Sequence, residues 1–261
     1  MWVAEPPTLG GKNDTRGRPG RPHTPTAHAL SDETFVEAVK RPRVKICCIG
    51  SVEEARVAIH YGASAIGLVS EMPSGPGVIA EERIRQIARS VPPAVASFLL
   101  TSKQDVDSIV AQQRHCGVNT IQICDHLAEG SYDDLREAMP GIALVQVIHV
   151  NGPEGLDRAL SVARHVDGIL LDSGDQSLPI KELGGTGRTH DWSISRQIRE
   201  AVDVPIFLAG GLNPGNVRAA IDQVGPFGVD VCSAVRTRGA LDEEKLAAFF
   251  SQIAEDERQK L

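Results

Sequence analysis

Short apolar runs alternate with amphipathic stretches along most of the chain, from Val44 to the carboxyl terminus. The apolar runs are rich in Val, Ile, Leu and Ala, which indicates strands that are buried on both faces. The stretches between them repeat apolar residues at helical spacing, so we predict eight strand–helix pairs. The predicted strands are 44–48, 65–69, 94–100, 120–124, 143–149, 168–171, 205–209 and 229–232. The predicted helices are 52–61, 81–89, 104–115, 132–139, 155–164, 194–201, 216–223 and 242–254.

Local signals support several of these helix ends. Ser51 with Glu54 three residues later has the spacing of a capping box, in which each residue bonds the backbone of the other. Gly62 and Gly117 follow the first and third helices and are expected to end them.

Eight equal strand–helix units are the number that closes a (β/α)8, or TIM, barrel. We therefore predict an α/β fold in which residues 43–261 form one barrel domain. A doubly wound open sheet is the competing interpretation, but it does not require eight equal units.

The amino-terminal segment has a different composition. Its first thirty or so residues are rich in Pro and Gly and nearly free of periodic apolar residues. Such a segment cannot bury enough surface to offset the entropy lost on ordering. We predict that residues 1–42 are a disordered or irregular extension of the barrel.

Composition narrows the functional classes. The 261-residue chain has a net charge of −7, which does not favour binding to nucleic acid. No apolar run reaches the ~20 residues that span a membrane, and no charged-then-apolar leader opens the chain. The five cysteines show no metal-ligand spacing, so we expect reduced thiols in a cytoplasmic protein that contacts neither membrane nor nucleic acid.

Two residues at predicted strand ends are candidates for chemistry. Cys47 lies near the carboxyl end of the first strand, and Asp172 follows the sixth. In barrels of this kind the active site is built at the carboxyl ends of the strands. A thiol and a carboxyl group on opposite sides of one pocket can serve as base and acid. The alternatives are that Cys47 is a small buried apolar residue and that Asp172 only caps a loop.

Two late loops are suited to a phosphate. The loop after the seventh strand contains Gly210 and Gly211, and the loop after the eighth runs from Cys232 to Val235 and could open a short extra helix. The loops after strands 7 and 8 commonly form the phosphate site of such barrels. No Walker or dinucleotide motif is present, so a sugar phosphate is favoured over a nucleotide. The alternative is that the glycines serve only tight turns.

Four motifs between residue 43 and the carboxyl end carry a family resemblance. They are Lys45-Ile46-Cys47, Gly184 to Trp192 (GGTGRTHDW), Leu208 to Pro214 (LAGGLNP) with Asn216-Val217, and Gly228 to Val231 (GVDV) with Ser233. Together they resemble the phosphoribosylanthranilate isomerase family, whose members are TIM-barrel enzymes of tryptophan biosynthesis. The two glycine-rich motifs are specific as a pair, although each is weak alone.

The resemblance implies an aldose–ketose isomerase that converts N-(5-phosphoribosyl)anthranilate to a 1-deoxyribulose phosphate by an Amadori rearrangement, with no cofactor and no metal. It implies that Cys47 is the general base for the C2 proton and that Asp172 is the general acid for the ring oxygen. The residues that it assigns to the substrate phosphate are Gly184, Gly185, Gly210, Gly211, Ser233 and Ala234.

The sequence departs from the family at the end of the site expected to hold the aromatic acid. Pro76 stands where the family has an arginine that we expect to meet the anthranilate carboxylate. Losing that contact costs about 1.5–3 kcal/mol unless another cation replaces it, and Arg188 and Arg236 are the candidates. The chain also departs from the family motifs elsewhere. It has Cys48 where the family has Gly, Gly50 where the family has Thr, and Cys124-Asp125 where the family has His-Gly. Its segment from Cys232 to Arg236 (CSAVR) stands where the family has SSGVE. Asp125 and His126 either contact a different aglycone or, as we prefer, face water.

Three other functions remain open. The first is a related barrel isomerase for another sugar phosphate, and the second is a phosphosugar-binding protein without turnover. The third is a metal-dependent hydrolase built on scattered residues, namely Cys47, Cys124, His126, His149 and Cys232. In each sugar-phosphate case the partner is a small molecule, and the chain is expected to be a monomer or a homodimer.

Overall fold

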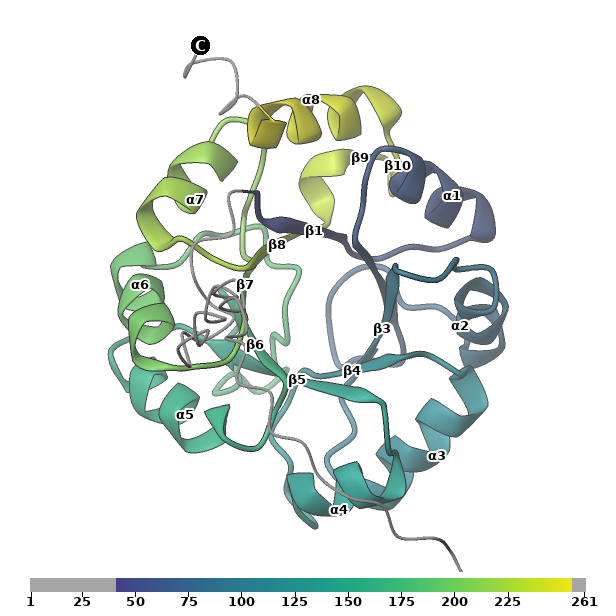
Figure 1. Cartoon of the computed structure of the whole chain (residues 1–261), viewed down its shortest axis with the longest axis vertical. Coiled ribbons are helices and arrows are strands. Elements are labelled where there is room, and N and C mark those ends of the chain that lie inside the picture. Colours follow the sequence, from purple (N-terminus) through teal and green to yellow (C-terminus); the bar gives the residue numbers. More distant parts are fainter. Residues whose placement is uncertain (1–40, 255–261) are drawn as a thin grey trace, which may run out of the picture. The chain divides into compact units, whose positions relative to one another are not determined.

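The computed structural model describes residues 41–254, which form a closed barrel of eight parallel strands, as predicted (Figure 1). The strands are β1 (Arg43–Ile46), β2 (Ala65–Val69), β3 (Ala96–Thr101), β4 (Thr120–Ile123), β5 (Ala143–His149), β6 (Gly168–Asp172), β7 (Ile206–Leu208) and β8 (Gly228–Val231). The helices are α1 (Val52–His60), α2 (Glu81–Ala88), α3 (Val106–Cys116), α4 (Tyr132–Ala138), α5 (Glu154–Ala163), α6 (Trp192–Ala201), α7 (Val217–Val224) and α8 (Glu243–Ala254). The extension predicted over residues 1–42 lies almost wholly outside the described residues, as do residues 255–261.

Each strand pairs with the next in chain order, and β1 closes the ring against β8. In this closing pair, Lys45 lies opposite Asp230 and Ile46 lies opposite Val231. Figure 1 shows the helices as an outer ring around the strands. The closure brings the first and last strands together, so residues near both ends of the barrel sequence contribute to one mouth.

Two apolar layers, one on each face of the barrel sheet, explain why the strand sequences are continuous apolar runs. Val44 and Ile46 point outward into the layer between sheet and helices. Residues of the alternate set, such as Cys47, Phe98 and Phe207, pack inside the barrel. Because successive side chains alternate between the two faces of a strand, nearly every residue of the barrel strands is buried in one layer or the other.

The predicted element ends agree with the structure to within two residues. The differences matter at two catalytic candidates. β1 ends at Ile46, so Cys47 and Cys48 follow the strand instead of completing it. Asp172 ends β6, one residue beyond the predicted bound at Leu171, and lies opposite His149 of β5.

Two predicted helix signals are wrong. Ser51 Oγ accepts the N–H of Glu54 at 3.1 Å, but the Glu54 carboxylate accepts the N–H of Gly50 at 2.9 Å and not that of Ser51, so the capping box is only half formed. α1 ends at a right-handed Tyr61, not at Gly62, whereas Gly117 ends α3 in the left-handed conformation as predicted. Glu54 is diverted because it also binds Arg236, which sequence spacing cannot reveal.

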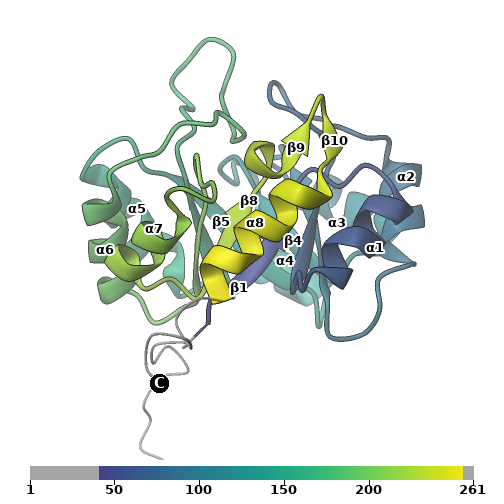
Figure 2. The ribbon, with the colours of Figure 1, turned by 90° about the horizontal axis from the view of Figure 1, so that it is seen from above.

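The loops that follow the strands gather at one mouth of the barrel. Figure 2 shows the long green loop between β6 and α6 rising on the same side as the β9–β10 hairpin. The short helix predicted after β8 is present as the 3-10 helix η1 (Ser233–Val235). The hairpin of β9 (Arg236–Thr237) and β10 (Ala240–Leu241) was not predicted. No helix formed by residues 41–254 is both long and apolar enough to cross a membrane.

Candidate active site

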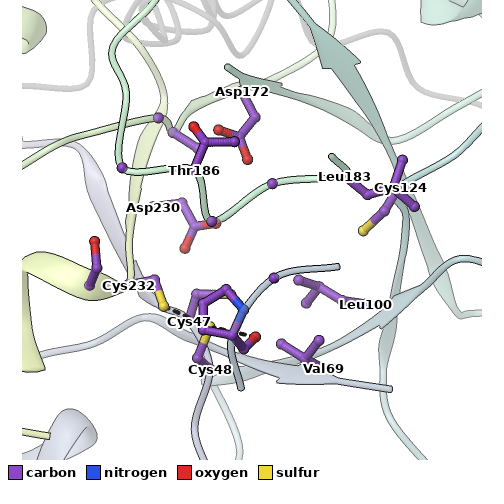
Figure 3. A pocket seen from close by; sticks show the side chains of 18 of the residues that line it. Cys47, Cys48, Val69, Leu100, Cys124, Asp172, Leu183, Thr186, Asp230 and Cys232 are labelled. Atoms are coloured by element: carbon purple, nitrogen blue, oxygen red, sulfur yellow. Dashed lines mark hydrogen bonds between the residues drawn. The ribbon is translucent and has the colours of Figure 1, made fainter. Parts of the chain in front are cut away.

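A pocket opens at the mouth, where the carboxyl ends of the strands meet. It encloses about 720 Å³, a volume that includes open solvent at its entrance. Both acid–base candidates, Cys47 and Asp172, line it, and Figure 3 shows them on different sides of the pocket. Of the residues assigned to phosphate, Gly184, Gly185, Gly210, Gly211 and Ser233 line it too, and Ala234 lies beside it in η1.

The Cys47 thiol is buried on the inner side of the barrel, next to a fixed positive charge. Gly67 of β2 shows how closely the two groups sit. A Cβ atom on Gly67 would lie 2.8 Å from Cys47 Sγ and 3.1 Å from the Lys45 Nζ atom. Both groups therefore border the same glycine, and any larger residue there would displace the thiol.

Lys45 and Asp230 form an ion pair beneath Cys47. Their Nζ and Oδ2 atoms are 2.7 Å apart, and the Lys45 side chain is fully buried. Burial alone would lower the pKa of Lys45, but the Asp230 carboxylate outweighs it and raises that pKa, so the ammonium stays charged. Asp230 also lines the pocket, and its Oδ1 has no partner among the described residues. This oxygen is free to accept a hydrogen bond from a ligand.

Arg236 holds the backbone that carries the Cys47 thiol. Its Nη2 donates to the carbonyl oxygens of Cys47 (3.2 Å) and Cys48 (2.6 Å), and its Nη1 donates to Glu54 Oε1 (3.0 Å). Burial alone would lower the pKa of Arg236, but the Glu54 carboxylate reverses this and raises it. The guanidinium thus ties the end of β1 to α1 and to the hairpin after β8.

Asp172 is held as a buried carboxyl group. Its Oδ1 accepts the Ser173 N–H at 2.7 Å. A Cβ atom on Gly184, whose φ is +133°, would lie 2.7 Å from Oδ2, so only glycine lets the loop approach the carboxyl this closely. Burial raises the pKa of Asp172, although the bond from Ser173 opposes the rise. A carboxyl group with a raised pKa is suited to hold and deliver a proton.

The loops after β2 and β6 meet over the pocket. Ser74 Oγ donates to the carbonyl oxygen of Lys181 at 2.7 Å, and the Lys181 ammonium binds Asp125 Oδ2 at 2.6 Å. A Cβ atom on Gly185 would lie 2.6 Å from Pro76 Cδ, so these loops are in direct contact. Near its base, Ser173 and Thr186 share a hydrogen bond of 2.7 Å that closes the β6 loop on itself. The covering loop is therefore pinned at several points.

The wall formed after β7 and β8 presents backbone donors. Among residues 41–254, the N–H groups of Gly210, Gly211 and Ser233 donate to no protein acceptor. The side-chain amides of Asn213 and Asn216 donate to the Gly211 carbonyl oxygen at 3.1 and 3.0 Å, which fixes this loop. Fixed backbone N–H groups without protein acceptors are suited to bind an anion such as phosphate.

The two arginines suggested as replacements for the missing cation do not fill that role. Arg236 is committed to Glu54 and to backbone carbonyls, and Arg188 pairs with Glu182 at the surface. Neither lines the pocket, and among the described residues no other Lys or Arg lines it either. Pro76 lies in the pocket wall at the position of the absent arginine.

The preferred reading of Asp125 as water-facing is also wrong. Asp125 is only 3% exposed and binds Lys181, whereas the His126 side chain is 63% exposed as expected. Burial alone would raise the pKa of Asp125, but the bonds from Lys181 and His126 outweigh it and lower that pKa. Neither residue lines the pocket, so neither contacts an aglycone there.

The residues considered for a metal-dependent hydrolase do not form a ligand cluster. Nε2 of His149 bonds the carbonyl oxygen of Cys124 at 3.0 Å, and the His126 ring lies beside Gln104. Within residues 41–254 no group of three or more His, Cys, Asp or Glu side chains is placed to hold a metal ion.

Fold and site together define a (β/α)8-barrel protein with a thiol and a carboxyl group in one pocket, beside a wall of backbone N–H groups that have no protein acceptor among the described residues. The family model for N-(5'-phosphoribosyl)anthranilate (PRA) isomerase matches residues 44–252. The chain therefore belongs to the N-(5'-phosphoribosyl)anthranilate isomerase family.

Individual relatives agree with this assignment. N-(5'-phosphoribosyl)anthranilate isomerase 2 of Methanosarcina mazei is 36% identical over 216 residues, which cover 82% of this chain and 95% of the relative. The isomerase of Haloferax volcanii is 36% identical, with 80% and 91% covered. The crystal structure of the Thermotoga maritima isomerase has a TM-score of 0.69 at 30% identity, with 82% and 98% covered. An isomerase solved in complex with reduced 1-(o-carboxyphenylamino)-1-deoxyribulose 5-phosphate has a TM-score of 0.66 at 29% identity, with the same coverage.

Proposed function

We propose that this chain catalyses the Amadori rearrangement of N-(5-phosphoribosyl)anthranilate to 1-(o-carboxyphenylamino)-1-deoxyribulose 5-phosphate, a step of tryptophan biosynthesis. The observation that carries the proposal is the shared pocket. Cys47 and Asp172 line it together with the backbone N–H groups of Gly210, Gly211 and Ser233. A base, an acid and an anion site are what this isomerisation requires.

In the first step Asp172 donates its proton to the ring oxygen of the sugar. The ring opens, and the anthranilate nitrogen supplies electrons to form an iminium at C1. The raised pKa of Asp172 supports this role because it keeps the proton on the carboxyl group to a higher pH.

In the second step Cys47 removes the proton from C2. The electron pair of the C–H bond moves toward the iminium, and the resulting enol tautomerises to the ketose. The charged Lys45 ammonium borders the same glycine as the thiol, and Asp230 Oδ1 can accept a hydrogen bond from a sugar hydroxyl. Lys45 and Asp230 are therefore positioning residues for the base.

The phosphate is assigned to the wall formed by Gly210, Gly211, Ser233 and Ala234, with Gly184 and Gly185 of the β6 loop closing over it. Fixed N–H groups are effective here because they need no reorganisation when the dianion binds. The phosphate would anchor one end of the substrate and hold C1 and C2 between thiol and carboxyl.

The direct test is to follow the loss of N-(5-phosphoribosyl)anthranilate fluorescence with pure protein. We expect catalytic turnover to a product that borohydride reduces, because the product is an open-chain ketose. Unchanged fluorescence with folded protein and fresh substrate would contradict the proposal.

A second substrate tests the missing cation. Since no Lys or Arg among the described residues lines the pocket, the carboxylate contributes little binding through a cation. The aniline analogue, which lacks this carboxylate, should change KM by less than about tenfold, whereas a guanidinium contact of about 1.5–3 kcal/mol would change it more. A larger increase would mean that a cation outside the pocket wall reaches the carboxylate.

A further inference from the structure

Two cysteines that are far apart in sequence meet in the pocket wall. The Sγ atoms of Cys48 and Cys232 are 2.6 Å apart, although 184 positions separate the residues. Both side chains line the pocket, and Figure 3 shows their sulfur atoms facing each other. This approach is closer than ordinary contact between two thiols and nears the length of a disulfide bond, about 2.05 Å.

The barrel closure produces this meeting. Ile46 of β1 pairs with Val231 of β8, so Cys48, the second residue after β1, and Cys232, the first residue after β8, leave neighbouring strand ends. Cys48 adopts a φ of 61°, which few non-glycine residues do, and Arg236 holds its carbonyl oxygen at 2.6 Å. Cys48 and Cys232 are also two of the positions at which the chain departs from the family motifs.

The surroundings give the two thiols different roles. A hydrogen bond from Cys48 and the nearby Arg236 lower the pKa of Cys232, although burial opposes this. The same hydrogen bond raises the pKa of Cys48, and burial adds to the rise. Cys232 is partly exposed, whereas Cys48 is buried. Cys232 is thus the more accessible sulfur and the one that carries negative charge first.

We propose that Cys48 and Cys232 are a reversible oxidation site, which a low-molecular-weight disulfide such as glutathione disulfide converts to an intramolecular disulfide. The Cys232 thiolate attacks one glutathione sulfur, forms a mixed disulfide and expels one glutathione thiolate. The Cys48 thiol then loses its proton, attacks Cys232 Sγ and expels the second glutathione. The protein loses two electrons and two protons, and these reduce one glutathione disulfide to two thiols.

The other cysteines are less suited to this reaction. Cys116 and Cys124 are fully buried. Burial raises the pKa of Cys116 to about 12 and also raises that of Cys124. Cys47 is adjacent in sequence to Cys48, so an experiment must separate these two. The proposal does not rest on the reaction proposed above, because it is argued from the distance, exposure and surroundings of the two thiols.

The test counts thiols and maps the link. The full chain is incubated with glutathione disulfide, its thiols are counted after denaturation, and its tryptic peptides are analysed by mass spectrometry. We expect the five thiols to fall to three and to return to five with dithiothreitol. Residues 46–56 should be linked to residues 219–236, and fragmentation should place the bond on Cys48. Five remaining thiols, or a bond from Cys232 to Cys47, would overturn the proposal.

Three variants test the order of attack, with folding checked by circular dichroism. Cys48→Ser should lose one of its four thiols and carry one glutathione on Cys232, because no resolving thiol remains. Cys232→Ser should keep all four thiols. The matched control Cys116→Ser should fall from four thiols to two, as the pair is intact. Glutathione on Cys48 in Cys232→Ser would refute the assigned roles.

Discussion

At the scale of single residues, the barrel interior has to accommodate two opposite charges. Lys45 is fully buried and Asp230 nearly so, and they pair at 2.7 Å below Cys47. Replacing a buried ion pair by apolar residues is often neutral for stability, whereas removing one partner leaves the other charge buried and unpaired. The pair can therefore be retained for the reaction rather than for the fold, and this distinction can be measured.

Lys45→Met leaves the Asp230 carboxylate buried without its partner. We expect it to lower the free energy of unfolding by about 3–5 kcal/mol and to reduce kcat/KM at least about tenfold. The double variant Lys45→Met/Asp230→Leu should recover most of the stability but none of the activity. Urea unfolding and fluorescence assays on the same samples separate the two effects. Recovery of activity in the double variant would show that the charges serve only folding.

The sequence signalled these residues without revealing their role. Lys45 interrupts the apolar run of β1, and Asp230 interrupts that of β8. Neither sequence motif indicates that the two side chains meet. Their pairing depends on the β1–β8 register, which joins residues 185 positions apart. Cys47 and Asp172 were predictable because strand ends in this fold converge at one mouth.

At the scale of elements, the loop after β6 covers the pocket and is fastened by Lys181. The ammonium binds the buried Asp125 after β4, and the Lys181 carbonyl accepts from Ser74 after β2. One residue thus joins three loops. The fastening could not be predicted from the sequence, because Asp125 looked like an ordinary loop residue.

Lys181→Met removes the ammonium and leaves Asp125 with weaker partners. We expect a loss of about 1–3 kcal/mol of stability in urea unfolding and a several-fold higher KM, because the cover is less well held. Arg188→Gln is the matched control for stability. Its pair with Glu182 is largely exposed, so the loss should stay below about 1 kcal/mol. Equal losses in both variants would contradict the fastening role.

At the scale of the whole barrel, the closing seam between β1 and β8 is reinforced by Arg236 and Glu54. Glu54 accepts bonds from Arg236, from Gly50 and from the Leu241 N–H of the hairpin. Burial alone would raise the pKa of Glu54, but these bonds lower it below its usual value of 4.5. Its contribution to stability is therefore full above the usual pKa and is lost as the pH falls through the lower folded-state pKa.

Glu54→Gln should cost about 1–3 kcal/mol at neutral pH, since the Arg236 guanidinium loses its charged partner. It should also flatten the acid side of the stability curve, because a glutamine does not titrate. Urea unfolding between about pH 7 and pH 3 checks both effects. Glu137→Gln, at an exposed position, should leave the curve unchanged. A parent-like acid slope in Glu54→Gln would rule out this linkage.

The sequence predicted the barrel well because eight repeated units leave few ways to close. It predicted the pocket cover and the seam poorly. Arg236 looked like a substrate contact, yet it binds Glu54, and Glu54 looked like a helix cap, yet it binds Arg236. Contacts between distant loops follow from the closed ring and not from local spacing.

The central claim is that Cys47 and Asp172 act on one substrate in one pocket. Its most direct test is kcat/KM for N-(5-phosphoribosyl)anthranilate with Cys47→Ala and Asp172→Asn, beside the parent and the buried control Cys116→Ala. We predict a loss of at least about 100-fold in each of the first two and less than about twofold in the control. Parent-like activity in either Cys47→Ala or Asp172→Asn would contradict the account.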